Sequence, residues 1–385
     1  MCVSPLIRYR LKRGVSSDSF FGSSTSFSVK SLKQLQEYFL SYSAFKDYFD
    51  TNMDYQYIKC RKCVECRADY ASEWSIRCYH EFQIRKVASF ITLTVDDCRA
   101  SDFLKEKNLK HYCKRCVKGN RYIKYPINYT LCKGLVQDFL KRLRDNIQNK
   151  YGVKIRYFGC GEYGEQEERP HYHILIFGFD FPDRRFYKMS NKGFEIDVSD
   201  FLMDQWKYGI ATVQNVDHKV CMYTAKYVMK KIKSNDDITI QEQYFGREPE
   251  FLFMSKGNCQ VNRCKHIDDI IKNCKGLNSL RNLENPYCKN CDKTRGGIGY
   301  DWFLHYYRDV MKIGYCTVEG IKYPIPNYYL EILKLTDSQK YDNYKLSVLN
   351  RIDEFEEKHP DDRSQEKLEV KKKILKSKLK LYHRE

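Results

Sequence analysis

The chain has 385 residues, and its 68 Lys and Arg against 50 Asp and Glu give a formal net charge of +18. This length is enough for one main domain with appendages, and the excess of cations favours a polyanionic partner such as nucleic acid. The sequence has no run of about 18 apolar residues and no hydrophobic signal core, which argues against membrane insertion or secretion. We therefore expect a cytosolic protein with no membrane partner.

Two further features of the composition bear on function. The 32 Tyr and 22 Phe residues supply many flat apolar faces on which unstacked bases can lie beside Lys and Arg. The 17 Cys residues are expected to be reduced in a cytosol, so their paired spacings favour metal ligation or ordinary burial over disulfides.

In chain order, residues 15–30 are rich in Ser and Gly and indicate a flexible loop. Apolar and basic positions from Cys66 to about Val87 predict a helix, and the β-branched run at residues 90–95 predicts a strand. An amphipathic helix that Gly152 can end is predicted by apolar residues recurring every four positions: Leu135, Phe139, Leu143 and Ile147.

Two strands at residues 154–160 and 172–177 follow, and the turn between them predicts a hairpin. Residues 210–216 read as another strand, after which Asp217 is placed to cap a helix that runs to about Ile232. The order of elements predicts an α+β fold with a central antiparallel β-sheet and helices packed on one face. A doubly wound parallel sheet fits this order less well.

We divide the chain into four predicted parts. An N-terminal extension covers residues 1–55, and a core with a Cys-rich entry helix covers residues 56–233. A Cys-containing insertion and the C-terminal part of the core occupy residues 234–335, before a charged helical tail at residues 336–385.

The His171-Tyr172-His173 triplet opens the second strand of the predicted hairpin. Side chains alternate along a strand, so both imidazoles share one face and Tyr172 lies on the other. Two imidazoles side by side make half of a metal site, although strand histidines satisfied by backbone carbonyls would show the same pattern.

Glu162 lies at the end of the first hairpin strand. A hairpin brings this end close to the histidines, so the carboxylate is a candidate third ligand beside His171 and His173. Two nitrogens and one oxygen anion would hold a divalent ion against a phosphodiester. The alternative is that Glu162 is a solvated turn residue.

Tyr223 and Tyr227 lie four residues apart on the helix that Asp217 caps. Positions i and i+4 share a helical face, so both hydroxyls are candidate nucleophiles, and Lys226 between them is a candidate phosphate contact. A phenol that attacks phosphorus forms a covalent phosphotyrosine, and two tyrosines permit two successive transesterifications. In a chain this rich in Tyr, the spacing also arises by chance.

These residues resemble the motifs of a known family. Residues 169–173 look like the two-histidine motif of HUH endonucleases, residues 90–94 resemble their first strand motif, and residues 223–227 resemble the two-tyrosine motif. The chain is further similar to replication initiation proteins of gokushoviruses, which are small single-stranded DNA phages. That similarity rests on residues 60–67, 73–81, 161–164, 295–302 and 324–329.

The resemblance implies rolling-circle initiation in the cytoplasm of a bacterial host. An origin strand of single-stranded DNA is nicked with Mg²⁺ or Mn²⁺, a tyrosine keeps the 5′ phosphate, and the free 3′ hydroxyl primes a host polymerase. The sequence has no Gly-x-x-x-x-Gly-Lys-Ser/Thr phosphate loop, so unwinding is expected from a host helicase. Basic residues on the helices are expected to contact DNA: Lys141, Arg142, Arg144, Lys230 and Lys231.

The Cys pairs suggest a second, structural metal. Cys60-x-x-Cys63-x-x-Cys66 supplies three thiols, and Cys113-x-x-Cys116 supplies two, so a Zn²⁺ site that combines clusters is a candidate. No single cluster has the complete spacing of a standard zinc finger, and buried Cys is common.

Two other function classes stay open from sequence alone. One is a non-catalytic single-stranded nucleic-acid-binding protein with structural zinc, which explains the charge. The other is a metal-dependent phosphodiesterase that uses water, for which Tyr223 and Tyr227 are ordinary helix residues.

Overall fold

A computed structural model shows two compact units, which we describe separately. One comprises Met1–Tyr70 with Leu349–Glu385, and the other comprises Ala71–Val348. The four predicted sequence parts remain predictions. The structure describes residues 6–11, 26–29, 53–60, 63–95, 129–164, 168–190, 193–230, 247–255, 296–359 and several positions between 361 and 377.

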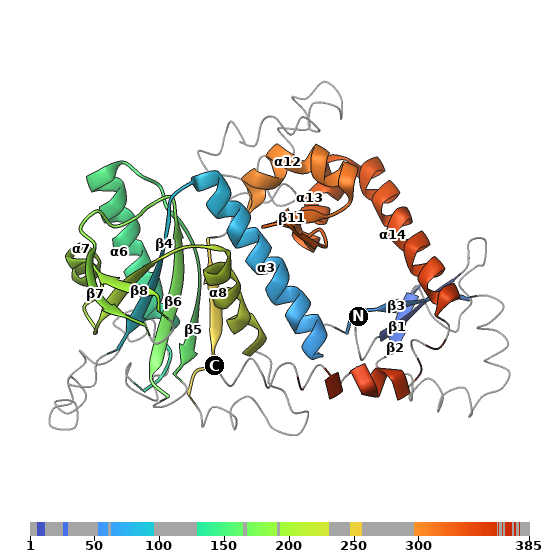
Figure 1. Cartoon of the computed structure of the whole chain (residues 1–385), viewed down its shortest axis with the longest axis horizontal. Helices are drawn as coiled ribbons and strands as arrows, with labels where there is room; N and C mark the ends of the chain where they lie inside the picture. Colours follow the sequence, from blue (N-terminus) through green and yellow to red (C-terminus); the bar gives the residue numbers. More distant parts are fainter. Residues whose placement is uncertain are drawn as a thin grey trace. The chain divides into compact units, whose positions relative to one another are not determined.

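The larger unit is built on a seven-stranded antiparallel sheet with the strand order β10-β5-β6-β4-β9-β8-β7 (Figure 1). The β6 strand, which carries the His-x-His triplet, lies between β5 and β4 inside the sheet. The strands are β4 (Ala88–Thr94), β5 (Arg156–Tyr163), β6 (Pro170–Phe177), β7 (Arg185–Met189), β8 (Glu195–Val198), β9 (Ala211–Asn215) and β10 (Phe251–Met254).

One face of this sheet packs against helices α6 (Lys133–Tyr151) and α7 (Asp200–Gln205). Alternation along β6 sends Tyr172 and Ile174 into this core, where they meet the apolar stripe of α6. Gly152 ends α6 as predicted, because it adopts the left-handed conformation at φ +69°. The same alternation leaves His171 and His173 on the opposite face.

The opposite face packs against α3 (Val64–Arg85), from Ala71 on, and α8 (His218–Lys230). Trp74 of α3 stacks on Phe158 of β5 at a centroid distance of 4.8 Å, and Ala225 of α8 is buried in the same core. The cap predicted at Asp217 is present, since its carboxylate accepts a hydrogen bond from the backbone N–H of Val220 at 2.7 Å.

The C-terminal part of the larger unit forms a second core around α3. It contains α12 (Tyr300–Ile313), the β11–β12 hairpin (Cys316–Val318 and Ile321–Tyr323) and α13 (Asn327–Thr336). The imidazole of His80 on α3 stacks on Trp302 at a centroid distance of 3.3 Å. The long helix α14 (Ser338–Lys358) follows and agrees with the helical tail predicted by the sequence.

The smaller unit contains a three-stranded antiparallel sheet. Its order is β2-β1-β3, with β1 at Leu6–Leu11, β2 at Ser26–Val29 and β3 at Met53–Ile58. The loop predicted at residues 15–30 is therefore wrong at its end, where a short β-branched and aromatic segment pairs with β1. Backbone pairing, which local Ser content does not report, decides that conformation.

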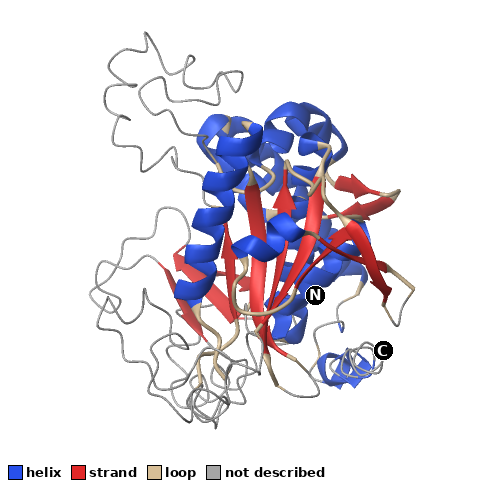
Figure 2. Ribbon diagram, turned by 90° about the vertical axis from the view of Figure 1, so that its left-hand side faces the viewer, coloured by secondary structure: helices blue, strands red, loops and turns tan. Residues whose placement is uncertain are grey.

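The predicted α+β class with a central antiparallel sheet is confirmed. Helices cover both faces of the sheet, so α3 and α8 form a layer in addition to that of α6 and α7 (Figure 2). Among the helices that the structure describes, none combines the length and the apolar character needed to cross a bilayer.

Candidate active site

The hairpin register places the predicted ligands on one face of the sheet. The Cα atom of His171 on β6 lies opposite that of Glu162 on β5, and His173 lies opposite Thr92 of β4 on its other side. Opposed residues of antiparallel strands project to the same face, so Glu162 is a direct neighbour of His171 and a diagonal neighbour of His173. The proximity expected from hairpin geometry is therefore present.

His173 and Glu162 are in direct contact. The Nε2 atom of His173 lies 2.8 Å from Oε1 of Glu162, and both residues are buried, with 8% and 7% of their surfaces exposed. Phe90 stacks in parallel on the imidazole at a centroid distance of 5.6 Å. The carboxylate lies in a nearly dry environment, where an imidazole nitrogen or a bound cation stabilises it strongly.

Thr92 fixes the other side of the His173 ring. Its Oγ1 lies 3.0 Å from Nδ1 of His173. A hydroxyl both donates and accepts, so Thr92 supports either neutral tautomer. It donates to Nδ1 when Nε2 carries the proton toward Glu162, and it accepts from Nδ1–H when the Nε2 lone pair is used to bind a cation.

His171 is half-buried and bonded to the backbone. Its Nδ1 donates to the carbonyl oxygen of Arg169 at 2.8 Å, which leaves Nε2 as the ring atom with a lone pair. Burial and the neighbouring His173 lower the pKa of His171, while the Arg169 carbonyl and Glu162 oppose that shift. A neutral imidazole is the form that binds metal ions. Gly164 gives the ring room, because a Cβ there would lie 3.1 Å from Cε1 of His171.

The donor set fits a divalent cation at two of its three positions. Two ligands bound at about 2.1 Å and at right angles lie roughly 3.0 Å apart, which is close to the 2.8 Å between His173 and Glu162. The ligand atoms of His171, His173 and Glu162 do not all lie within 4.8 Å of one another, a condition that one Cys cluster among the described residues meets. His171 would join the pair by turning its ring toward Glu162.

Tyr223 lies beside this centre on α8. Its ring meets the His173 ring edge to face at a centroid distance of 6.0 Å and meets Phe90 at 6.2 Å. Because 45% of Tyr223 is exposed, a substrate can reach it from solvent. Tyr227 and Lys226 lie on the same helix, with Tyr227 four residues after Tyr223, but their side chains are outside the described part of the structure.

The residues predicted to contact DNA are distributed over both faces of the sheet. Lys141, Arg142 and Arg144 lie on α6, on the face away from His173, and Arg142 donates to the carbonyl oxygen of Gln205 at 2.9 Å. Lys230 is the last residue of α8 on the His173 side, and Lys231 lies outside the described residues.

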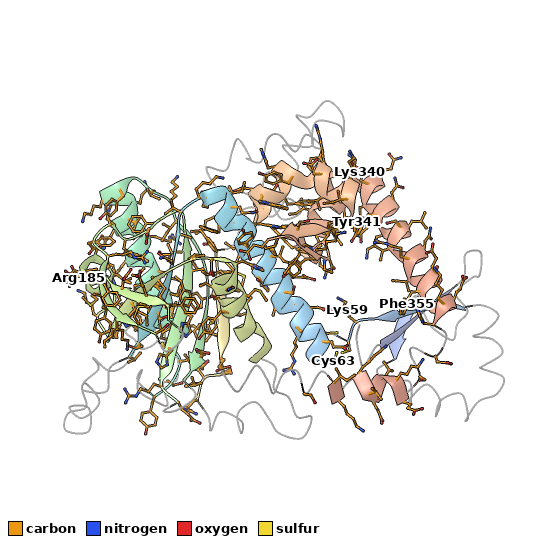
Figure 3. All side chains as sticks on the ribbon, in the orientation of Figure 1. Lys59, Cys63, Arg185, Lys340, Tyr341 and Phe355 are labelled. Carbon is orange, nitrogen blue, oxygen red and sulfur yellow. The ribbon has the colours of Figure 1, made fainter. Side chains whose placement is uncertain are left out.

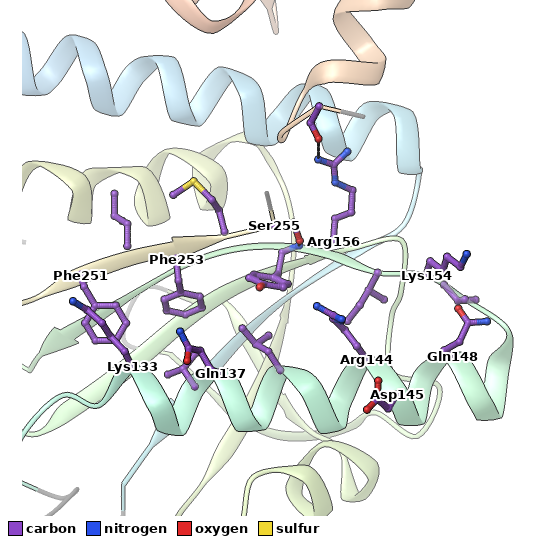
Figure 4. A pocket seen from close by; sticks show the side chains of 18 residues that line it. Lys133, Gln137, Arg144, Asp145, Gln148, Lys154, Arg156, Phe251, Phe253 and Ser255 are labelled. Atoms are coloured by element: carbon purple, nitrogen blue, oxygen red, sulfur yellow. Dashed lines mark hydrogen bonds between the residues drawn. The ribbon is translucent and has the colours of Figure 1, made fainter. Parts of the chain in front are cut away.

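A cavity of about 700 Å³ opens between α6 and the strands β5 and β10 (Figure 4). Arg144, Lys133 and Lys154 line it together with Phe251 and Phe253. The cavity lies on the α6 face, so it is separated by the sheet from the pair formed by His173 and Glu162.

The candidate zinc residues divide into described and undescribed groups. Cys60, Cys63 and Cys66 form a cluster whose sulfur atoms all lie within 4.8 Å of one another. Cys113 and Cys116 lie outside the described residues, so the predicted combination of two clusters stays a prediction.

Sequence reasoning missed the roles of Thr92 and Phe90. Both lie within the strand predicted at residues 90–95, and period-two alternation puts them on the face of β4 that flanks His173. Combining that alternation with the register of β4 against β6 would have found them, but pairing between distant strands is not encoded in either strand alone.

Comparisons with known proteins give a consistent picture. A family model for replication-associated proteins of the ORF2 type matches residues 125–232, which include His171, His173 and Tyr223. The replication-associated protein VP4 of Bdellovibrio phage phiMH2K is 26% identical over 303 residues, which cover 77% of this chain and 74% of that protein.

Two further relatives carry similar names. The replication-associated protein ORF2 of Spiroplasma virus 4 is 30% identical over 213 residues, covering 54% of this chain and 58% of that protein. The replication-associated protein ORF4 of Chlamydia phage 1 is 21% identical over 300 residues, covering 76% of this chain and 58% of that protein. No solved structure matches the chain.

Proposed function

We propose that this chain, whose resemblance to phage replication proteins is confirmed, initiates replication of viral DNA by nicking and rejoining a single strand through tyrosine transesterification. One observation carries the proposal. An exposed tyrosine, Tyr223, lies against the ring of a buried histidine, His173, that is bonded to the carboxylate of Glu162. A nucleophile of the predicted kind and two ligands of the predicted kind therefore lie together.

The bond changes in this reaction are those of a phosphoryl exchange. The Tyr223 oxygen attacks phosphorus, the bond from phosphorus to the 3′ oxygen breaks, and the products are a 5′-phosphotyrosine link and a strand with a 3′ hydroxyl. The phenol proton is lost to solvent or a base, and the leaving oxygen takes up a proton. Attack by the 3′ hydroxyl of a strand on the phosphotyrosine reverses these steps and rejoins DNA, because the energy of the cut bond is kept.

His173, Glu162 and His171 would hold a divalent cation, Mg²⁺ or Mn²⁺. When bound, such an ion neutralises charge on the non-bridging phosphate oxygens and makes the phosphorus more electrophilic. Burial of the His173 and Glu162 pair keeps its geometry fixed, and Thr92 orients the imidazole. The chain's own groups thus position the scissile phosphate beside Tyr223.

Tyr227 and Lys226 complete the proposed machinery. Tyr227 lies one helical turn after Tyr223, which suits a second nucleophile for a second exchange, and Lys226 provides a cation for the phosphate. Lys230 on the same helix would contact the DNA backbone. The 3′ hydroxyl would serve a host polymerase in the bacterial cell, with a host helicase opening the duplex.

An adduct assay tests the proposal. The full chain is incubated with labelled single-stranded origin DNA and Mg²⁺ or Mn²⁺, and products are resolved in SDS. We expect a protein–DNA adduct together with a strand bearing a free 3′ hydroxyl. The Tyr223→Phe and Tyr227→Phe double variant should form no adduct, whereas Tyr187→Phe, a matched change at an exposed tyrosine on β7, should form it normally.

The other function classes make different predictions in the same assay. Nicked DNA without an adduct is the result expected of a water-using phosphodiesterase. Binding without any product is the result expected of a nucleic-acid-binding protein. Either result with the wild-type chain would contradict the proposal.

A further inference from the structure

Three thiols lie together where the chain passes from β3 into α3. Cys60 follows the end of β3 at Ile58, and Cys63 and Cys66 flank the start of α3 at Val64 (Figure 3). Their sulfur atoms all lie within 4.8 Å of one another, and the sulfur atoms of Cys60 and Cys66 are 3.9 Å apart. Cys66 is buried and the other two are half-buried, so the cluster is shielded from bulk solvent on one side.

The spacing of the sulfur atoms matches one tetrahedral ion. Zinc binds thiolates at about 2.3 Å, and two such ligands at a tetrahedral angle lie roughly 3.8 Å apart. The distance between Cys60 and Cys66 is 3.9 Å. In an iron–sulfur cube each thiolate binds a different iron atom, which spreads the cysteines further apart than one shared ion does.

The backbone around the cluster favours thiolates. The backbone N–H of Cys63 donates to the sulfur of Cys60 at 3.2 Å, so this sulfur already accepts a bond that stabilises negative charge. Arg67 adds a cation one turn into α3, and its backbone N–H donates to the carbonyl of Cys63 at 3.0 Å. Three thiolates on a divalent ion carry one net negative charge, which a nearby guanidinium offsets.

We propose that Cys60, Cys63 and Cys66 bind one Zn²⁺ ion and that this ion fastens the end of β3 to the first turn of α3. A further ligand completes the four that structural zinc takes. The site does not depend on the nicking reaction. Its three sulfur ligands suit a soft ion, whereas the histidines and carboxylate on β5 and β6 suit harder ions as well, so the two sites differ in the metals they retain.

The consequence for the fold is local. The turn between β3 and α3 is short, and its backbone is held by few hydrogen bonds among the described residues. Because an ion binds the folded arrangement and not the open one, it stabilises that arrangement by its binding free energy. Removing it should therefore loosen the start of α3 before the rest of the helix.

Metal analysis of the full chain, produced without a histidine tag and equilibrated with Zn²⁺, tests the proposal. After dialysis we expect about one zinc per chain, and a Cys60→Ser, Cys63→Ser or Cys66→Ser variant should each lose it. Cys132→Ser, a change at a half-buried cysteine outside the cluster, should keep the zinc. The His171→Ala and His173→Ala double variant should keep it too, which separates this site from the proposed active site.

Cobalt substitution decides the question even if a Ser variant fails to fold. Co²⁺ bound by three or more thiolates in a tetrahedral site gives strong sulfur-to-metal absorption in the near ultraviolet and intense visible bands. We expect these bands in the wild-type chain and their loss when Zn²⁺ is added in competition. Absence of the bands, zinc retained by all three Ser variants, or iron with cluster absorption in place of zinc would each overturn the proposal.

Discussion

His173 and His80 are both buried histidines of the larger unit, but their surroundings are chemically opposite. His173 contacts a carboxylate on one nitrogen and a hydroxyl on the other, and an exposed tyrosine lies against its ring. His80 is fully buried, stacks on Trp302, and has the Tyr329 hydroxyl 2.9 Å from its Nδ1. Burial alone therefore does not distinguish a functional histidine from a packing one, whereas an adjacent carboxylate and an accessible nucleophile do.

The electrostatics follow the same division. Burial, together with the nearby His218, lowers the pKa of His80 to about 3, so this ring is neutral at physiological pH and serves as an aromatic surface. Glu162 gives His173 a charged partner within hydrogen-bond distance. The first environment stabilises the fold, and the second prepares two ligands on one face of the sheet.

The largest expected effect is on nicking when His173 is replaced. His173→Gln keeps a side chain of similar size but removes the imidazole that contacts Glu162 and Thr92. Nicking should fall by more than about 100-fold, because losing a ligand exceeds the effect of losing a residue that orients one. Gel quantification of adduct gives the rate, and a chemical melt should show a change in unfolding free energy of no more than about 2 kcal/mol.

His80→Ala should reverse that pattern. The change removes a ring stacked between Trp302 and Tyr329 and should lower the unfolding free energy by roughly 2–4 kcal/mol, as other buried large-to-small changes do. Nicking per folded molecule should stay within about twofold of wild type at a temperature where both proteins are folded. If it fell as far as in His173→Gln, the division between the two histidines would be wrong.

A smaller effect is expected at Thr92. Thr92→Val keeps the shape of the side chain and removes the hydroxyl that contacts Nδ1 of His173, so nicking should fall about 10-fold. Thr92→Ser keeps the hydroxyl and should stay within about threefold of wild type. Equal losses in both variants would show that packing, and not orientation of the imidazole, explains the effect.

The smallest expected effect is on the pH dependence of stability. Between pH 6.5 and about 3 the unfolded chain binds a proton at His80 that the folded chain does not, so the unfolding free energy falls as pH decreases below 6.5. Burial and Glu81 raise the pKa of Asp301, which acts in the opposite direction. Comparing wild type with His80→Phe by denaturant melts from pH 7 to pH 5 isolates the histidine, and the variant should show the shallower decline.

The sequence predicted the centre of the sheet well because local patterns decide it. Alternation at residues 171–173 separates the histidine face from the Tyr172 face, and a short hairpin fixes where Glu162 must lie. The cap at Asp217 and the end of α6 at Gly152 are likewise local signals. The roles assigned to these site residues remain predictions.

The missed features depend on contacts between distant parts of the chain. Thr92 and His173 meet only through the pairing of β4 with β6, which lie about 80 residues apart in sequence. The β7–β8 hairpin has an irregular register between Phe186 and Lys188, so its alternation is broken and the sequence pattern predicts no strand there. The helices α12 and α13 bury aromatic side chains against α3, and that packing is not visible in their composition.

Peptide mapping of the covalent adduct tests the central claim most directly. Trypsin cleaves after Lys219, Lys226 and Lys230, so Tyr223 and Tyr227 fall in separate peptides, 220–226 and 227–230. After nuclease trimming, mass spectrometry should find a phosphonucleotide on the peptide 220–226, and in the Tyr223→Phe variant any adduct that remains should map to 227–230. A phosphonucleotide on any other peptide, or nicked DNA without a modified peptide, would contradict the account.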